Sequence, residues 1–154
     1  MVNKDCLTQI NNRYMFEYLL KKEMTLTFEK KHPLCMVFFD IYQFKKVNET
    51  YGIQVGDDIL VLLCKLVAKN LRQNDVLCRW GGDEFVLILP ETTYEKAQEI
   101  VAKIDFTIQK YKFIKNVAIL CNFSVTAYQE EDAFDELVNR MTDRFYEMKY
   151  ALKK

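Results

Sequence analysis

Histidine is nearly absent from this sequence, because His32 is the only one among 154 residues. Catalytic triads that depend on histidine and metal sites built from several histidines are therefore almost excluded. A charge excess is lacking too, since Lys and Arg number 22, as do Asp and Glu. A general nucleic-acid binder carries a basic excess. We therefore expect no DNA partner, although a local basic patch is not excluded.

Long apolar runs, glycine and proline are also scarce. The longest runs, such as residues 59–64, are far too short to cross a bilayer, and the N-terminus has no apolar signal region. We therefore expect no membrane contact within this segment. Five widely spaced cysteines without a Cys-x-x-Cys pair favour a reduced, cytoplasmic compartment, although a longer protein could be anchored to a membrane elsewhere.

The residues that are present indicate one globular domain. Half of them are hydrophobic and 29% are charged, as in soluble domains. A chain of this length buries about two thirds of its surface on folding. We expect residues 1–154 to form a single domain.

Apolar runs bounded by turn residues predict the strands. A continuous run between Pro33 and Asp40 is typical of a strand buried on both faces. Two runs around Gly-Gly-Asp-Glu predict a β-hairpin. The expected strands are residues 34–39, 76–80, 85–89 and 117–128.

Helical periodicity occupies most of the remaining chain. Asn11 or Asn12 can cap the first helix, Thr92 with Glu95 forms a capping box, and Asp132 can cap the last helix. The expected helices lie at residues 12–31, 59–71, around 97–104 and around 134–148. A polar loop, with Asn48, Gly52 and Gly56, is expected before the second helix.

The order of these elements predicts the fold class. Without the first helix, the order is βαββαβ plus a terminal helix. This order is typical of the ferredoxin-like split, an α+β fold with helices on one face of a central antiparallel sheet.

Three carboxylates are the strongest candidates for a functional site. Asp40 ends the buried strand, and Asp83 and Glu84 lie in the hairpin turn. If the two strands are neighbours, these carboxylates crowd one sheet edge and repel unless a proton or cation lies between them. Oxygen ligands favour Mg²⁺ or Mn²⁺, and Gly81 and Gly82 would let a phosphate approach the backbone. The alternative is an ordinary hairpin turn with a solvated strand-end aspartate.

These residues resemble the signature of the GGDEF family, the diguanylate cyclase domains. The hairpin carries Gly81-Gly82-Asp83-Glu84-Phe85 after Arg79-Trp80. Further stretches similar to family motifs follow in the right order over almost the whole chain: Asp5-Cys6-Leu7-Thr8 with Asn12-Arg13, Asp40-Ile41-Tyr42-Gln43-Phe44-Lys45 with Asn48, Tyr51-Gly52 with Gly56-Asp57, and Asp143, Tyr146 and Lys149.

The resemblance implies a nucleotidyl-cyclase-like palm that condenses two GTP molecules into cyclic di-GMP and two pyrophosphates. Each half of a homodimer would hold one Mg-GTP. The family positions imply that Asp83 and Glu84 are catalytic and that both, with Asp40 and the Ile41 carbonyl, hold Mg²⁺ or Mn²⁺. Asn48 and Asp57 correspond to the guanine readers, although Asp57 could instead cap a helix. The other substrate-binding positions are Phe44, Lys45, Gly81, Gly82, Lys149 and Lys153.

A second binding site is implied by Arg72 and Asp75, five residues before Gly81. They resemble the family's R-x-x-D site, at which the product cyclic di-GMP inhibits the enzyme. The alternative is an exposed salt bridge at a helix end, which contributes little.

Departures from the family pattern keep other functions open. Tyr42 stands where the family has a second aspartate, Ile53 replaces a loop histidine, and Lys153 replaces an arginine. Besides an enzyme of low activity, the alternatives are a signalling module that binds GTP or cyclic di-GMP without turnover, a ligand-free pairing domain, and a cyclase acting on another nucleotide. Because such domains are commonly fused to sensory regions, we expect this one to be excised from a larger signalling protein.

Overall fold

A four-stranded antiparallel sheet, in the order β2-β3-β1-β4, forms the centre of the computed structural model, which describes residues 3–152. The strands are β1 (Leu34–Ile41), β2 (Val76–Gly81), β3 (Glu84–Pro90) and β4 (Cys121–Ala127). With α3 (Ile53–Lys69) after β1 and α4 (Tyr94–Lys110) after β3, the chain has the expected ferredoxin-like βαββαβ order.

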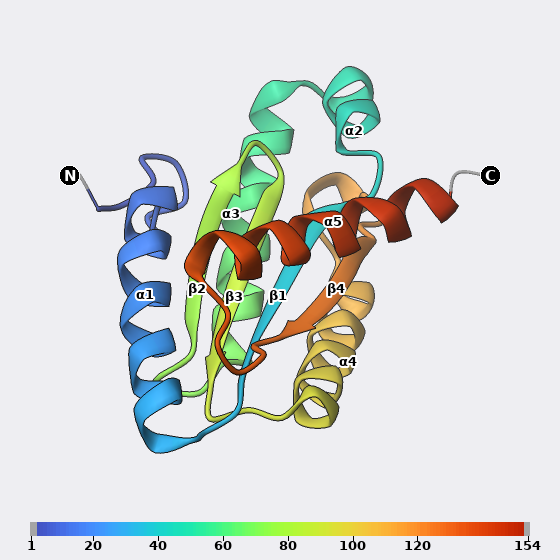
Figure 1. The fold of residues 1–154 in the computed structure, drawn as a ribbon. Helices are drawn as coiled ribbons and strands as arrows, with labels where there is room; N and C mark the ends of the chain where they lie inside the picture. The colour runs from blue at the N-terminus through green and yellow to red at the C-terminus, as the bar shows by residue number, and fades with distance from the viewer. Residues whose placement is uncertain (1–2, 153–154) are drawn as a thin grey trace.

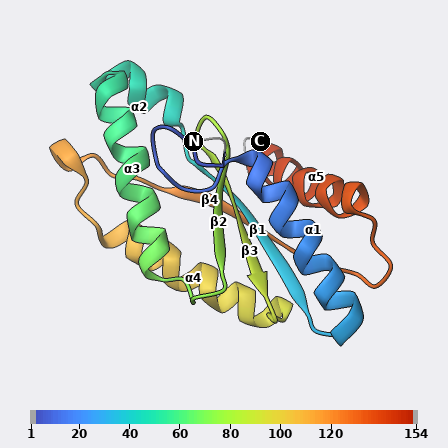
Figure 2. The ribbon, with the colours of Figure 1, turned by 90° about the vertical axis from the view of Figure 1, so that its left-hand side faces the viewer.

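Helices cover both faces of this sheet (Figures 1 and 2). Helices α3 and α4 cover one face, as the ferredoxin-like split requires, and α1 (Arg13–Lys30) and α5 (Phe134–Leu152) cover the other. The expectation of helices on a single face therefore describes only the βαββαβ core. None of the helices within residues 3–152 combines the length and hydropathy that a bilayer crossing requires.

Strand alternation divides the apolar side chains between two cores. Val37 and Phe39 of β1 lie in the core under α3 and α4, whereas Met36 and Phe38 lie in the core under α1 and α5. All eight residues of β1 are buried, as its apolar run predicts. Asp40 shares the α5 face with Met36 and Phe38, so this carboxylate lies at the end of an apolar strand face.

The prediction of a polar loop after β1 is wrong over most of that segment. Residues Phe44–Tyr51 form α2, and α3 already begins at Ile53. Helix α2 has eight residues and buries none of them completely, with Phe44 and Val47 only partly buried against the core, so its apolar pattern is shorter than the window over which helical periodicity is read. Asp57 consequently lies inside α3 and is not its N-cap.

Other element boundaries also differ from the sequence prediction. Thr93, not Thr92, caps α4 by accepting a hydrogen bond from the Lys96 N–H. Asp132 precedes α5 by two residues, and its carboxylate accepts hydrogen bonds from Arg140 instead of capping the helix. Strand β4 starts at Cys121 because a 3₁₀ turn, η1 (Ile114–Asn116), and an irregular segment precede it.

Candidate functional site

Asp40 and Glu84 are direct neighbours across the β1–β3 ladder. Alternation directs both side chains toward α5, because Phe39 and Phe85 beside them lie in the opposite core. The Asp40 side chain is 1% exposed, and Asp83 in the hairpin turn is half-buried. The fold therefore brings the three predicted carboxylates to one end of the β1–β3 pair.

The Asp40 carboxylate accepts one hydrogen bond on each oxygen. Asn122 of β4 donates from Nδ2 to Oδ1 at 2.9 Å, and Lys149 of α5 donates from Nζ to Oδ2 at 2.5 Å. Burial lowers the pKa of Lys149, but its hydrogen bond to Asp40 and the acidic charges around it raise the pKa overall. The ammonium therefore stays charged and balances the buried carboxylate.

Glu84 is held by Tyr146 of α5, whose hydroxyl donates to Oε2. Burial, together with this hydrogen bond and the Glu84 charge, raises the pKa of Tyr146, so the phenol remains a donor over the physiological pH range. Helix α5 thus supplies a donor to each of the two paired carboxylates. Both donors lie one helical turn apart on the same face of α5.

The pKa of Asp83 is affected by the negative charge at this edge of the sheet. Burial and then the charge of Asp40 raise the pKa of its carboxyl group. A carboxylate under such repulsion is stabilised by a proton or by a cation. The site is therefore electrostatically suited to a divalent ion.

The donor set fits Mg²⁺ or Mn²⁺, although the side chains do not form a complete cage. Within residues 3–152 there is no group of three His, Cys, Asp or Glu side chains arranged to hold a metal ion. Mg²⁺ commonly binds through one or two carboxylates and completes its shell with substrate phosphates and water. Asp40 and Glu84 are suitable as such a pair. In this structure the ammonium of Lys149 forms an ion pair with Asp40.

A cavity of about 470 Å³ adjoins this acidic edge. Asp83 and Lys149 reach it from the sheet edge and α5, and Asn122 lies at its side. The segment that joins β1 to α2 forms the other wall. Five predicted site residues line the cavity, together with Tyr42, Gln43 and Asn122: Ile41, Phe44, Lys45, Asp83 and Lys149.

Four further predicted substrate residues within the described part of the chain are not among those that line the cavity: Asn48, Asp57, Gly81 and Gly82. The Asn48 side chain lies directly against Gly56, where the Oδ1 atom is 1.8 Å from the place a Cβ would occupy. Only glycine allows this contact, which brings Asn48 beside the start of the segment that carries Asp57. At the hairpin, a Cβ on Gly81 or Gly82 would meet nothing within 4 Å, so the turn is open to a ligand.

Arg72 and Asp75 lie at the opposite end of β3, in the wall of a second cavity of about 420 Å³. The Arg72 Nε and Nη2 atoms donate to the two oxygens of Asp75 at 3.0 and 2.8 Å, and Nη2 also reaches Thr92 Oγ1 at 2.5 Å. Asp75 is 1% exposed, whereas Arg72 is 46% exposed. Arg72 and Asp75 therefore form an ion pair in which the carboxylate is buried and the guanidinium is partly exposed.

Two residues of the candidate site, Asn122 and Tyr146, were not predicted as site residues from the sequence. Asn122 has no motif to mark it, and Tyr146 was noted only as part of a family pattern. Their significance depends on contacts across 82 and 62 residues of sequence. Lys153, a predicted substrate residue, lies outside the described residues.

A family model and several known proteins match almost the whole chain. The family model "Diguanylate cyclase, GGDEF domain" matches residues 2–154. The chain is 36% identical over 155 residues to the response regulator PleD of Caulobacter vibrioides and 29% identical over 150 residues to the diguanylate cyclase DgcP of Pseudomonas aeruginosa. These alignments cover 94% and 96% of this chain, but only 33% and 22% of the relatives.

A solved structure supports the fold. The crystal structure of the GGDEF domain of YfiN, or TpbB, from Pseudomonas aeruginosa superimposes with a TM-score of 0.87 at 27% identity. The match covers 94% of this chain and 92% of that one.

Proposed function

This chain belongs to the GGDEF family of diguanylate cyclase domains, and on that premise we propose that it condenses two GTP molecules into cyclic di-GMP. The observation that carries the proposal is the juxtaposition of Asp40, Asp83 and Glu84 at one sheet edge beside the 470 Å³ cavity. A bound Mg²⁺ would neutralise phosphate charge and activate an attacking hydroxyl.

The chain's own residues divide the remaining tasks. Lys45 and Lys149 line the cavity and carry the positive charge that a triphosphate needs. The open turn at Gly81 and Gly82 offers backbone N–H groups to phosphate oxygens. Glu84, held by Tyr146, and Asp83 accept or direct the proton that leaves the attacking hydroxyl.

Guanine recognition is assigned to Asn48 and Asp57. A carboxylate accepts both N1–H and N2–H of guanine, whereas adenine offers no such pair of donors. Gly56 supports this assignment because its missing side chain lets Asn48 lie against α3, beside Asp57. The pair would therefore select GTP over ATP.

The reaction needs two copies of the chain. In each half of a homodimer, the 3′ oxygen of one GTP attacks the α-phosphorus of the other. Each attack forms an O3′–P bond, breaks the bond between the α-phosphorus and its bridging oxygen, and releases pyrophosphate. Cyclic di-GMP then binds at Arg72 and Asp75, where the Nη1 group of the partly exposed guanidinium takes no part in the bonds to Asp75 and Thr92 and can donate to a phosphate.

The chain spans between about a fifth and a third of the lengths of PleD and DgcP. We propose that it is the cytoplasmic output domain of a longer signalling protein, because its GTP substrate is an intracellular metabolite.

Chromatography of the products decides between turnover and binding alone. Purified protein is incubated with GTP and Mg²⁺, in parallel with Glu84→Gln and with Arg72→Ala, which removes product inhibition. Cyclic di-GMP from the native chain and from Arg72→Ala, but not from Glu84→Gln, supports the proposal. GTP binding in calorimetry without product from a folded, concentrated Arg72→Ala sample contradicts it.

A further inference from the structure

The segment before α1 is docked onto the strand that leads into the hairpin. The Arg79 N–H donates to the Asn11 carbonyl at 2.8 Å, and Asn11 Nδ2 donates to the Leu77 carbonyl at 3.3 Å. Asn11 thereby forms a parallel bridge with Cys78 on the outer edge of β2. We call residues 4–12, which make this contact, the N-terminal loop.

Asp5 of this loop forms a half-buried ion pair with Arg79. The Arg79 Nη1 atom lies 3.1 and 2.9 Å from the two carboxylate oxygens, and the side chains are 20% and 16% exposed. Thr8 fixes the carboxylate from the other side, donating from its N–H at 2.8 Å and from its hydroxyl at 2.7 Å. Burial raises the pKa of Asp5, but these bonds from Thr8 and Arg79 lower it overall.

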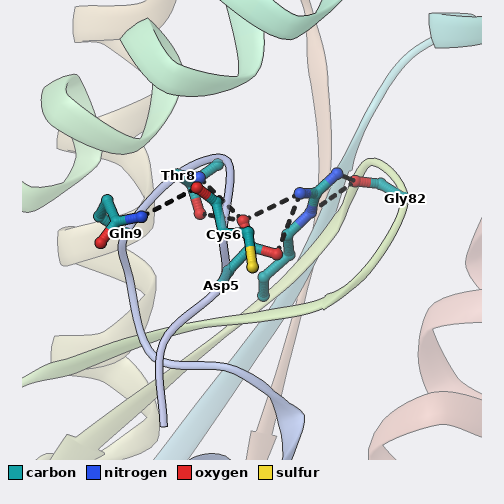
Figure 3. Close-up of polar contacts among 6 residues, drawn as sticks. Asp5, Cys6, Thr8, Gln9 and Gly82 are labelled. Atoms are coloured by element: carbon teal, nitrogen blue, oxygen red, sulfur yellow. Dashed lines mark hydrogen bonds and ion pairs between the residues drawn. The ribbon is translucent and has the colours of Figure 1, made fainter. Parts of the chain in front are cut away.

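The same guanidinium also forms hydrogen bonds with the hairpin turn. Arg79 Nε and Nη2 donate to the Gly82 carbonyl at 3.0 and 2.7 Å, so one planar group joins Asp5 to the residue before Asp83 (Figure 3). Gly82 has a φ of +50°, and the β2–β3 register shifts between Arg79 and Gly81. Two consecutive glycines give a turn many alternative conformations, and both glycines of this turn are exposed.

We propose that Arg79 is a positioning residue that selects one conformation of the hairpin turn, and that Asp5 of the N-terminal loop holds Arg79 in the required orientation. The N-terminal loop is thereby coupled to the carboxylates of Asp83 and Glu84. A rearrangement that withdraws Asp5 releases the guanidinium and loosens the acidic edge. The kinetic consequence rests on the function proposed above, whereas the structural coupling does not.

A second ion pair in the same chain provides a matched control. Arg140 contacts both oxygens of Asp132 at 3.0 and 2.7 Å and donates to the Ala127 carbonyl at 2.8 Å. It joins a carboxylate to a backbone carbonyl as Arg79 does, but at the far end of β4. Replacing either arginine by lysine keeps the charge and removes the planar fork.

Amide hydrogen exchange of the full chain tests the coupling without any assay of activity. Asp5→Asn and Arg79→Lys are compared with Arg140→Lys at equal distance below each variant's melting temperature. We expect exchange at residues 81–85 to quicken about 10-fold or more in the first two variants, since a charge-assisted hydrogen bond contributes about 1.5–3 kcal/mol. In Arg140→Lys the hairpin should exchange as in the native chain.

Steady-state kinetics then tests the consequence for catalysis. With GTP and Mg²⁺, Arg79→Lys should lose about 10-fold in kcat with less than about 2-fold change in KM, because misplaced carboxylates impair the reacting geometry more than binding. Unchanged exchange at residues 81–85 in Asp5→Asn and Arg79→Lys, or equal quickening in Arg140→Lys, overturns the proposal. A native chain that makes no cyclic di-GMP refutes the proposed function, and the exchange experiment still decides the coupling.

Discussion

Replacement of Lys149 by methionine should make the stability of this domain depend strongly on divalent metal. The substitution keeps an unbranched side chain, one atom shorter, and removes the ammonium that lies 2.5 Å from Asp40 Oδ2. Asp40, at 1% exposure, is then left with Asn122 as its remaining donor among the described residues. Its charge becomes largely uncompensated.

The magnitude follows from the burial of the two partners. Removing one member of a fully buried pair costs about 3–5 kcal/mol. Lys149 is 29% exposed and Asn122 still binds one oxygen, so we expect a smaller loss of about 2 kcal/mol, below that range. For a chain of this length, such a loss lowers the melting temperature by about 4–8 °C.

Metal should abolish most of this deficit. A ligand at 100 times its Kd stabilises the folded state by about 2.7 kcal/mol, and in the variant no ammonium competes for Asp40. Thermal unfolding followed by circular dichroism, in EDTA and across a Mg²⁺ or Mn²⁺ titration, measures both effects. Lys96→Met, which removes an exposed pair with Glu99, is the control and should change the melting temperature little.

If the melting temperature of Lys149→Met stays below that of the native chain by the same amount at every metal concentration, the cation does not bind at Asp40. A normal melting temperature for Lys149→Met in EDTA would show instead that the ion pair contributes no stability.

Four further substitutions test other parts of the site. Asn122→Ala should weaken Mn²⁺ binding about 10-fold in calorimetry, because Asp40 loses its orienting donor; an unchanged Kd would contradict this role. Folding raises the pKa of Asp83 above 3.8, so its protonated form favours the native state in acid and stability is lost as pH rises through the native pKa. Asp83→Asn should therefore raise the melting temperature at pH 7, lose that gain below about pH 4, and abolish turnover; an equal gain at both pH values would refute the assignment. Tyr42→Asp adds a carboxylate beside the cavity that Asp83 lines and should lower the Mg²⁺ concentration for half-maximal activity, as a metal titration of initial rates can show. Arg72→Ala should raise the product concentration needed for half-maximal inhibition at least about 10-fold, and unaltered inhibition would place the product elsewhere.

The sequence was informative where local composition determines structure. The buried run at residues 34–39 and the glycine turn between two apolar runs predicted β1 and the β2–β3 hairpin, because proline, glycine and aspartate bound each run. The prediction failed for α2, since in a helix of eight residues two partly buried apolar side chains are too few to establish a helical period. It also misplaced the cap of α4 because Thr92 and Thr93 are adjacent and only one of them is free of Arg72.

The candidate site, too, was predictable only where local sequence determines the structure. The acidic edge could be predicted from two strand ends, given that the strands are neighbours. The partners of those carboxylates could not, because Lys149 is 109 residues from Asp40 and reaches it only after α5 has docked across the sheet. The role of Asn122 likewise requires β4 to lie beside β1, which no local pattern specifies.

The central place of β1 has a mechanical consequence for ligand entry. This strand is flanked by β3 and β4 and covered on both faces, so Asp40 stands on a rigid support. The hairpin that carries Asp83 and Glu84 includes β2, which lies at the edge of the sheet. Entry of a nucleotide should therefore leave Asp40 in place, and any adjustment should fall on the hairpin at the sheet edge.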